Sequence, residues 1–406
     1  MKIVINAIRV SRQSGGGLDH YIIHLVNELA KLGLPFDLYT FNPGHFQNVK
    51  PEHIIKPFSF CHISNTNGLS NIETVTQTLS QEKLSKFRSF LGRSIGDMIK
   101  LLWTQFIFPF LLVFRKYDIL FSPSQLDALF FTPENLKQVI TVLDLIPFIL
   151  TDQKHKHELY LKYLFPIILR KADHIITISG NTKQDVIKFF GIASQKITPV
   201  LLAKPGEGVS SELSNQMEVE EFKRKFGLTQ YILCVSGNHP HKNLKRLIEA
   251  FFFIKDQTRV QLVIVGYQDK AHQIELDHLV KNNKVEDRIK FFGHVSSEKL
   301  SLFYKGAEIF IFPSLYEGFG LPPLEALSYG VPTVVSQTSS LPEVVGDAGL
   351  YFDPQDIQDM AHKILQLLND QKLQEILRRK GMERAKVFTW EKTGELTLEV
   401  FEKLRV

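Results

Sequence analysis

The sequence predicts an α/β protein with two doubly wound, Rossmann-like domains that face each other across a cleft. Short apolar runs rich in Val, Ile and Phe alternate with segments of helical periodicity. Most of these runs are apolar at nearly every position, which is typical of parallel strands covered by helices on both faces. A chain of 406 residues is also long enough for two domains that each bury a core.

The expected strands fall into two groups, separated by a Pro-, Gly- and Ser-rich linker candidate at Lys204–Glu212. The first group is Lys2–Ala7, Phe36–Phe41, Tyr117–Ser122, Gln138–Leu143, His174–Ser179 and Ile197–Leu201. The second group is Tyr231–Ser236, Gln261–Val265, Ile289–Phe292, Glu308–Phe312, Thr333–Ser336 and Leu350–Phe352.

The overall composition excludes several classes of protein. The net charge is +5, but the basic residues are scattered and no aromatic-basic RNA motif occurs, so no nucleic-acid partner is expected. Cys61 and Cys234 lie far apart beside apolar residues, which indicates no disulfide framework and a reducing cytosol. Met1–Asn6 runs directly into the first strand, so no signal peptide is expected.

The most hydrophobic segment is Leu101–Phe114, which carries no charge and contains Pro109. It is shorter than the roughly 20 apolar residues that a spanning helix needs, so a core helix is expected. Basic residues flank it, which leaves peripheral contact with the inner face of the plasma membrane as the alternative. They are Lys86, Arg88, Arg93, Lys100, Arg115 and Lys116.

The most informative stretch is Glu317-Gly-Phe-Gly-Leu-Pro-Pro-Leu-Glu325, which follows an expected strand. Pro322 and Pro323 suit the first turn of a helix, so the order is strand, glycine turn, helix. Free backbone N–H groups and the helix dipole at such a turn favour a phosphate. The two carboxylates would accept hydrogen bonds from hydroxyl-rich groups. Phosphate beside polyols describes a nucleotide sugar.

This stretch resembles glycosyltransferase family 4, the retaining enzymes of GT-B fold, whose E-G-F-G-L-P-x-x-E-A signature matches Glu317 to Ala326. Gly330–Ser336 and Leu341–Gly349 are also similar to the family. The resemblance implies that Glu325 binds the ribose and that Glu317 is catalytic and orients the donor sugar. It implies that the backbone amides of Gly318, Phe319, Gly320 and Leu321 bind the diphosphate.

The resemblance covers nearly the whole chain and implies its domain boundaries. Residues 1–205 would bind the acceptor, and residues 206–387 would bind the nucleotide sugar. Residues 388–406 would form a helix that crosses back onto the first domain, with Thr389 as its N-cap.

A second anchor is Ser236–Phe251, where a turn leads into an amphipathic helix. It is similar to the family's G-x-x-x-x-K-N element, which assigns Gly237, Lys242 and Asn243 to the donor. A fixed Lys242 would stabilise charge on the leaving diphosphate, an effect often worth ~3 kcal/mol. The family commonly has Arg where this chain has Asn238, so His239, His241 or another residue would supply part of the charge.

Metal independence is expected, and the nucleotide-diphosphate sugar is a co-substrate rather than a cofactor. No D-x-D triplet occurs. His239 and His241 flank Pro240 without a nearby carboxylate or Cys, so a turn is favoured over a metal site.

The first strand is followed by Ser14-Gly-Gly-Gly-Leu18. Gly16 and Gly17 could bring backbone N–H groups to a phosphate, although His20 breaks the G-x-G-x-x-G fingerprint. A flexible loop is the alternative. Family members carry such a loop against the donor diphosphate or the acceptor, which favours the binding role.

Asp144 lies at an expected strand end in Thr141-Val-Leu-Asp-Leu-Ile-Pro147. Family members often have V-H-D-x-x-P here, and this chain has Leu143 in place of the His. Asp144 is a catalytic candidate that would accept the proton of the attacking hydroxyl, and a helix cap is the alternative. Ser340 and Glu343 have capping-box spacing. Ser179–Thr182 is expected to cap a helix or to face the interdomain cleft.

The resemblance therefore implies a cytoplasmic, retaining hexosyltransferase that acts in surface polysaccharide or lipopolysaccharide biosynthesis. Mannose from GDP-mannose is the favoured donor, and a glycan or lipid-linked saccharide is the acceptor. UDP-glucose or UDP-N-acetylglucosamine transfer is the runner-up. Leu143 and Asn238 motivate a different class, a nucleotide-sugar-binding protein that has lost catalysis. The E-G-F-G string argues against a sugar-nucleotide epimerase of the same fold.

Overall fold

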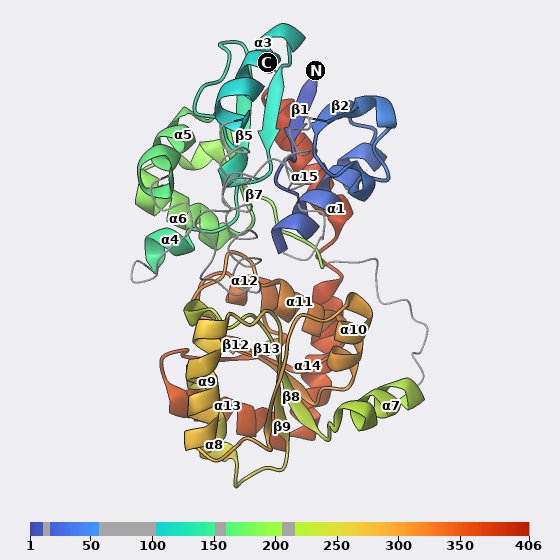
Figure 1. Ribbon diagram of the computed structural model, residues 1–406, viewed down its shortest axis with the longest axis vertical. Coiled ribbons are helices and arrows are strands. Elements are labelled where there is room, and N and C mark those ends of the chain that lie inside the picture. The colour runs from blue at the N-terminus through green and yellow to red at the C-terminus, as the bar shows by residue number, and fades with distance from the viewer. Residues whose placement is uncertain (11–16, 57–102, 151–159, 205–215, 406) are drawn as a thin grey trace, which may run out of the picture.

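The computed structural model describes residues 1–10, 17–56, 103–150, 160–204 and 216–405, and these form two lobes (Figure 1). The first lobe contains a seven-stranded sheet in the order β3-β2-β1-β4-β5-β6-β7, in which every pairing is parallel. Its strands are β1 (Ile3–Asn6), β2 (Phe36–Tyr39), β3 (Ile54–Ile55), β4 (Ile119–Ser122), β5 (Lys137–Val142), β6 (His174–Thr177) and β7 (Ile197–Pro199).

The second lobe contains a six-stranded parallel sheet in the order β10-β9-β8-β11-β12-β13. Its strands are β8 (Tyr231–Val235), β9 (Gln261–Val265), β10 (Ile289–Phe292), β11 (Ile309–Phe312), β12 (Thr333–Ser336) and β13 (Gly349–Phe352). Strand order reverses between β8 and β11, so their carboxyl ends border a crevice where parallel sheets usually bind ligands.

Helices cover both faces of the first sheet because successive strand residues are buried on opposite sides. Ile3 and Ile5 of β1 pack with α1 (Gly17–Lys31) and α15 (Trp390–Lys403), whereas Val4 packs with α3 (Phe108–Arg115). The remaining helical segments of this lobe are η1 (Pro43–His45), η2 (Pro51–His53), η5 (Trp103–Ile107), η6 (Gln125–Asp127), α4 (Ile146–Ile149), η7 (Tyr160–Leu164), α5 (Phe165–Lys171), α6 (Gly180–Phe190) and η8 (Ser194–Lys196).

The second sheet is covered in the same way. Leu233 and Phe312 face one layer of helices, and Ile232 and Ile311 face the other. The first layer is α7 (Gln216–Phe226), α10 (Ser297–Lys305), α11 (Leu321–Ser328), α12 (Leu341–Val345) and α14 (Gln371–Ala385). The second layer is α8 (Leu244–Ile254), α9 (Lys270–Asn282) and α13 (Ile357–Asn369), and η9 (Pro240–Lys242) precedes α8.

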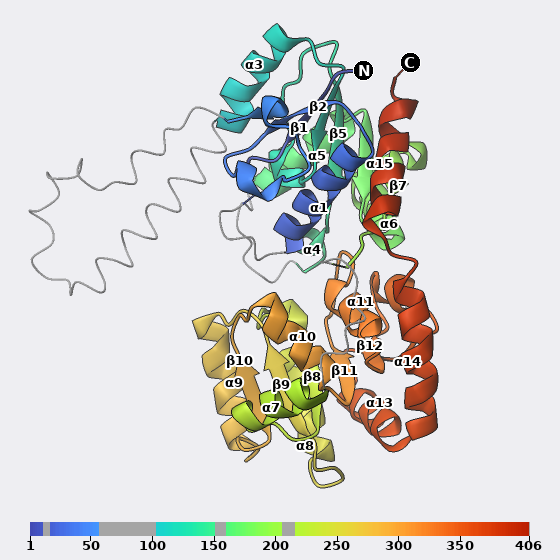
Figure 2. The ribbon, with the colours of Figure 1, turned by 90° about the vertical axis from the view of Figure 1, so that its right-hand side faces the viewer.

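The C-terminal helix α15 lies against α1 of the first lobe (Figure 2). The Thr389 side chain accepts a hydrogen bond from the Lys392 amide, which confirms the expected N-cap. The Trp390 indole donates to the Lys204 carbonyl at 2.9 Å, and Phe401 packs edge-on against Phe121. The end of the chain is therefore fastened to the first lobe by capping, hydrogen bonding and aromatic packing.

Each strand expected from the sequence occurs in the structure, and the α/β prediction is confirmed. The two-residue edge strand β3 was not expected, because two residues are too short to show a periodic pattern. Cys234 is fully buried in the core, and this burial raises the pKa of its thiol to about 12. Cys61 and all of the linker candidate except Lys204 lie outside the described residues.

The apolar segment near residue 108 is partly core and partly surface. Trp103, Phe108 and Leu112 are buried, as expected for a core helix. Phe110 and Phe114 are 63% and 69% exposed, which the core interpretation does not explain. None of the helices in the described part of the chain has both the length and the apolar character needed to cross a bilayer.

Candidate functional site

The two sequence anchors meet because β8 and β11 are neighbouring parallel strands. The turn after β8 carries Gly237 and Lys242, and the loop after β11 carries Glu317. The Leu315 amide donates to the His241 carbonyl at 2.8 Å, which ties the two loops together. The crevice at these strand ends is therefore bordered by both predicted motifs.

The glycine turn leads into α11 as the sequence predicts. Helix α11 begins at Leu321, with two prolines in its first turn. Gly320 has a φ of 120°, a conformation that favours glycine. A Cβ at Gly320 would lie 2.9 Å from a Leu341 methyl group, so packing adds to the backbone requirement. The turn thus brings the start of a helix close to the crevice, as anion binding requires.

Lys242 and Glu317 form an ion pair across the crevice. The Lys242 Nζ lies 2.6 Å from the Glu317 carboxylate, and both side chains are mostly buried. The Glu317 amide donates to the Ser339 hydroxyl at 3.0 Å, which fixes the backbone at this position. The pair therefore places a lysine, a residue type that commonly binds phosphate, at the wall of the crevice.

Glu325 lies deeper, against Tyr304 of α10. The Tyr304 hydroxyl donates to the Glu325 carboxylate at 2.8 Å. Burial raises the pKa of Glu325 to about 7, and the Tyr304 hydrogen bond and the Lys204 charge only partly oppose this. Glu325 is therefore a carboxyl group that ionises near neutral pH.

The first lobe reaches the same cavity through Gly17 and Asp144. One Asp144 carboxylate oxygen accepts the Ile146 amide at 3.1 Å. The N-cap of α4 is Leu145 and makes no side-chain capping bond, so Asp144 stabilises the turn before α4 and is not its cap. The backbone of Leu143 runs directly beside Gly318: a Cβ at Gly318 would lie only 2.0 Å from the Leu143 carbonyl oxygen. The donor loop and the end of β5 thus touch across the two lobes.

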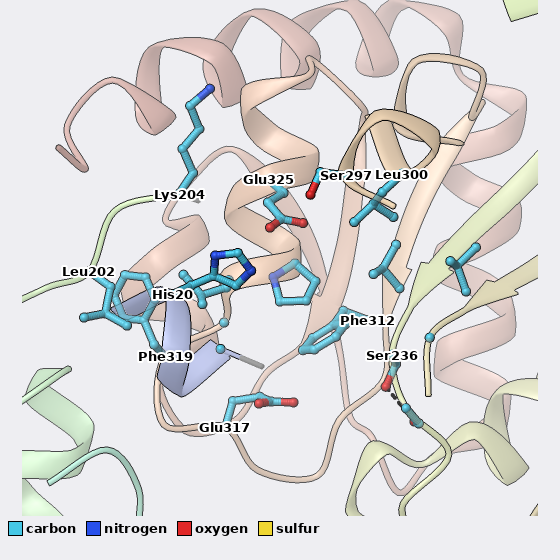
Figure 3. A pocket seen from close by; sticks show the side chains of 18 of the residues that line it. His20, Leu202, Lys204, Ser236, Ser297, Leu300, Phe312, Glu317, Phe319 and Glu325 are labelled. Atoms are coloured by element: carbon cyan, nitrogen blue, oxygen red, sulfur yellow. Dashed lines mark hydrogen bonds between the residues drawn. The ribbon is translucent and has the colours of Figure 1, made fainter. Parts of the chain in front are cut away.

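These groups line one cavity of about 1200 Å³. Glu317 and Glu325 lie on opposite sides of it, with Phe312 between them, and His20 of α1 lies on the side of Phe319 (Figure 3). This volume lies just above the 300–1,000 Å³ typical of small-molecule pockets.

Most of the predicted donor-binding residues line this cavity, as do the catalytic candidates. They are Gly17, Asp144, Gly237, Lys242, Glu317, Gly318, Phe319, Gly320, Leu321 and Glu325. Gly16 lies outside the described residues. Asn243 is placed differently: it is buried in an αL conformation, and its amide donates to the carbonyls of Pro313 and Pro354. Asn243 is therefore not among the cavity-lining residues, and its side chain joins the turn to two neighbouring loops.

The departure from the family at Asn238 has a structural explanation. The Asn238 side chain bonds both the amide and the carbonyl of Asp269, at 2.7 and 2.8 Å, and so joins two loops. His239 and His241 stack on each other in the expected turn and are not among the cavity-lining residues. Within the described ranges, no group of His, Cys, Asp and Glu has the geometry of a metal site.

Sequence reasoning missed several cavity residues. His20, Lys204 and Tyr304 line the cavity together with residues 294–298, which form the loop after β10 and the start of α10. Burial lowers the pKa of both His20 and Lys204. The loop follows β10, so its position at a strand end could have indicated it. Tyr304 has no such signal, since it reads as an apolar position of an amphipathic helix.

The capping-box interpretation of Ser340 and Glu343 is wrong. The Ser340 side chain makes no capping bond to α12, and it lies 3.0 and 2.6 Å from the carbonyls of Glu317 and Phe319. Glu343 instead accepts hydrogen bonds from the amides at the start of α6 in the other lobe. Tertiary partners outcompete the local bond that the spacing suggested.

Two family comparisons cover most of the chain. The family described as "Glycosyltransferase Family 4" matches residues 15–200, and "Glycosyl transferases group 1" matches residues 216–384. The chain is 32% identical over 279 residues to O-antigen chain mannosyltransferase B of Escherichia coli, covering 68% of this chain and 73% of that protein. It is 28% identical to O-antigen chain mannosyltransferase RfbU of Salmonella typhimurium, covering 54% and 57%. It is 29% identical to the serotype-specific mannosyltransferase WbdA of Escherichia coli, and the match covers 66% of this chain and 34% of that protein.

Solved structures agree on the fold. Sucrose-phosphate synthase from Thermosynechococcus elongatus superposes with a TM-score of 0.70 at 19% identity, over 99% of this chain and 98% of that one. Anabaena Alr3699/HepE, solved with UDP and glucose, superposes with a TM-score of 0.67 at 15% identity, over 99% and 100%. The GT-B fold expected from the sequence is confirmed. The chain therefore belongs to glycosyltransferase family 4 and is a glycosyltransferase.

Proposed function

We propose that the protein transfers mannose from GDP-mannose to a glycan or lipid-linked saccharide, with retention of configuration, during surface polysaccharide assembly. The observation that carries the proposal is the 32% identity to an O-antigen chain mannosyltransferase over 73% of that protein. The motif residues supply the chemistry, because Lys242, Glu317 and Glu325 surround one cavity at the end of parallel strands.

The donor would lie along the glycine turn. The backbone amides that lead into α11 and the Lys242 ammonium group would hold the diphosphate. Glu325 would accept hydrogen bonds from the ribose hydroxyls. Burial raises its pKa to about 7, and hydrogen bonds donated by a polyol would favour its ionised form. Glu317, already 2.6 Å from Lys242, would orient the hydroxyls of the sugar.

Transfer breaks the bond between the anomeric carbon and the diphosphate oxygen and forms a bond from that carbon to the acceptor oxygen. Negative charge grows on the diphosphate as the bond breaks, and Lys242 lies where it would offset that charge. The acceptor hydroxyl loses its proton in the same step. Asp144, on the first-lobe side of the cavity, is the proposed acceptor of that proton.

A transfer assay tests this function. Purified protein is incubated with radiolabelled GDP-mannose, UDP-glucose or UDP-N-acetylglucosamine and a lipid-linked saccharide acceptor, and labelled product is counted. Wild type and the Lys245→Met control are expected to transfer mannose, whereas Lys242→Met is expected to transfer it about 10²–10³-fold more slowly. Lys245 is a suitable control because it is an exposed lysine of α8 that pairs with Glu275. Transfer from a UDP donor but not from GDP-mannose would contradict mannose as the transferred sugar and keep the enzyme class. If no donor is turned over, the result would support a nucleotide-sugar-binding protein without catalysis.

A second proposal concerns location: we propose that the protein acts at the cytoplasmic face of an anionic membrane and contacts it through α3. Phe106, Phe110 and Phe114 are 63–70% exposed. Phe131 is also exposed, and Lys171 lies 5.6 Å from its ring centre. Exposed aromatic rings beside basic groups match an anionic lipid surface in both polarity and charge.

Vesicle sedimentation tests the membrane proposal. Wild-type protein is expected to bind vesicles that contain phosphatidylglycerol, and Phe110→Ser/Phe114→Ser is expected to remain in the supernatant. The control is Phe253→Ser on α8, which removes an aromatic ring that is 54% exposed in the other lobe. Equal binding by all three proteins, or none by wild type, would contradict the proposal.

A further inference from the structure

Helix α6 of the first lobe binds a carboxylate from the second lobe. The Glu343 carboxylate, on α12, accepts the Gly180 amide at 2.9 Å from each of its oxygens and the Asn181 amide at 3.3 Å. These amides begin α6, where the helix dipole also favours a negative charge. A Cβ at Gly180 would lie 3.2 Å from the carboxylate, so glycine gives the anion room to approach.

The opposite side of Glu343 is also held. Arg384 of α14 donates to the Glu343 carbonyl at 2.6 Å and to the Val344 carbonyl at 3.0 Å. The Arg384 guanidinium lies over the Phe388 ring, which in turn packs against Phe319 of the glycine turn. The backbone of the residue whose carboxylate contacts α6 is therefore held in place by hydrogen bonds and packing within the second lobe.

A second set of bonds joins α6 to the donor loop itself. The Tyr316 hydroxyl donates to the Asp185 carboxylate at 2.5 Å and accepts a hydrogen bond from the side-chain amide of Asn181 at 3.1 Å. The Thr182 hydroxyl lies 3.3 Å from the Gly318 carbonyl. Burial and the Asp185 hydrogen bond raise the pKa of Tyr316 far above neutrality, so its hydroxyl remains a donor.

Glu317 thus stands between two residues that α6 holds, Tyr316 and Gly318. Its own backbone is held by Ser339 and Ser340, which directly precede α12. Helix α6 therefore contacts α12 and also both sequence neighbours of Glu317. The two residues directly before α12 contact the backbone of Glu317 itself.

We propose that the α6 contact, made by Gly180, Asn181 and Asp185 with Tyr316 and Glu343, is a positioning device that sets the catalytic geometry of Glu317 when the two lobes meet. The device acts through the backbone, because Tyr316, Asp185 and Glu343 do not line the cavity. They are positioning residues rather than catalytic ones. The inference rests on the proposed transferase function and does not depend on which sugar is moved.

The test uses the full chain with two readouts for Tyr316→Phe and for Glu343→Ala. The first is hydrogen exchange of the backbone amides at residues 315–321, measured by mass spectrometry without substrate. Both variants are expected to exchange severalfold faster there. The second is turnover with the donor that the wild type uses, for which kcat is expected to fall about tenfold while the Kd for GDP stays within about threefold. Glu343→Gln keeps one acceptor oxygen and is expected to recover part of the lost rate.

Matched controls are Tyr163→Phe and Glu220→Gln, at exposed side chains that take no part in the α6 contacts described above. Exchange and kcat within twofold of wild type in both test variants would overturn the inference. An equal loss of kcat and of GDP affinity would also overturn it, because that result indicates general damage to the site. If wild type turns over no donor, the proposed function fails, and the exchange readout alone still decides whether α6 positions the loop.

Discussion

Adding one methyl group at Gly318 should separate the donor loop from the first lobe. Gly318 does not have a positive φ, so an alanine is compatible with its backbone conformation. The obstacle is purely steric. The new Cβ of Gly318→Ala would lie 2.0 Å from the Leu143 carbonyl oxygen and 3.0 Å from the Asp144 Cβ.

The size of the effect follows from this contact. A methyl carbon and a carbonyl oxygen approach to about 3.2 Å, so loop and strand end must separate by about 1.2 Å, since neither is the free end of a flexible side chain. A 1 Å misplacement of reacting groups can cost about 10²-fold in rate. Overpacking of this kind costs roughly 1–3 kcal/mol of stability, which a domain tolerates while remaining folded.

The assay is steady-state transfer at 25 °C, with thermal unfolding as the check on folding. We expect kcat of Gly318→Ala to be about 100-fold below wild type. The control is Gly44→Ala, because a Cβ at Gly44 meets nothing within 4 Å and Gly44 is not among the residues that line the cavity. Turnover by Gly318→Ala within threefold of wild type would refute the claim that the lobes meet at this contact during the reaction.

The remaining predictions concern charge, pH and location. Lys242→Met should reduce kcat by about 10²–10³-fold, the range for loss of one preorganised electrostatic contact, and a kcat above a tenth of wild type would count against its role. Glu325→Gln should raise the unfolding free energy at pH 8 by up to about 3 kcal/mol and leave it unchanged near pH 4. The sign follows because the folded pKa of about 7 lies above the ordinary value of 4.5, so ionisation destabilises the folded state as pH rises between them. A stability gain that is the same at both pH values would contradict that ionisation. Phe110→Ser/Phe114→Ser should lose vesicle binding while keeping transfer to a water-soluble acceptor, and a parallel loss of both would indicate damage to the fold instead.

Much of the architecture could be predicted because parallel strands are marked by continuous apolar runs. Runs such as Gln261–Val265 and Thr333–Ser336 match the observed strands residue for residue. The glycine turn and the prolines of α11 were also predicted, because each depends on a local backbone property. Local chemistry is what a single sequence states most directly.

Contacts between distant segments could not be predicted in this way. Glu343 has a suitable local partner in Ser340, yet its carboxylate lies on Gly180 of the other lobe. Asn243 matches a donor-binding motif, but its amide is used to join loops at Pro313 and Pro354. Each outcome depends on how two lobes and several loops pack, and sequence spacing carries no information about that packing.

The measurement that tests the central claim most directly is thermal unfolding with GDP, UDP or ADP, for wild type and Lys242→Met. A ligand present at 100 times its Kd stabilises the folded state by about 2.7 kcal/mol, which raises the melting temperature measurably. We predict that GDP raises the melting temperature of wild type, that UDP and ADP do so much less, and that Lys242→Met loses most of the GDP effect. An equal GDP effect in Lys242→Met, or no shift with any nucleotide, would contradict the account of this cavity as the donor site.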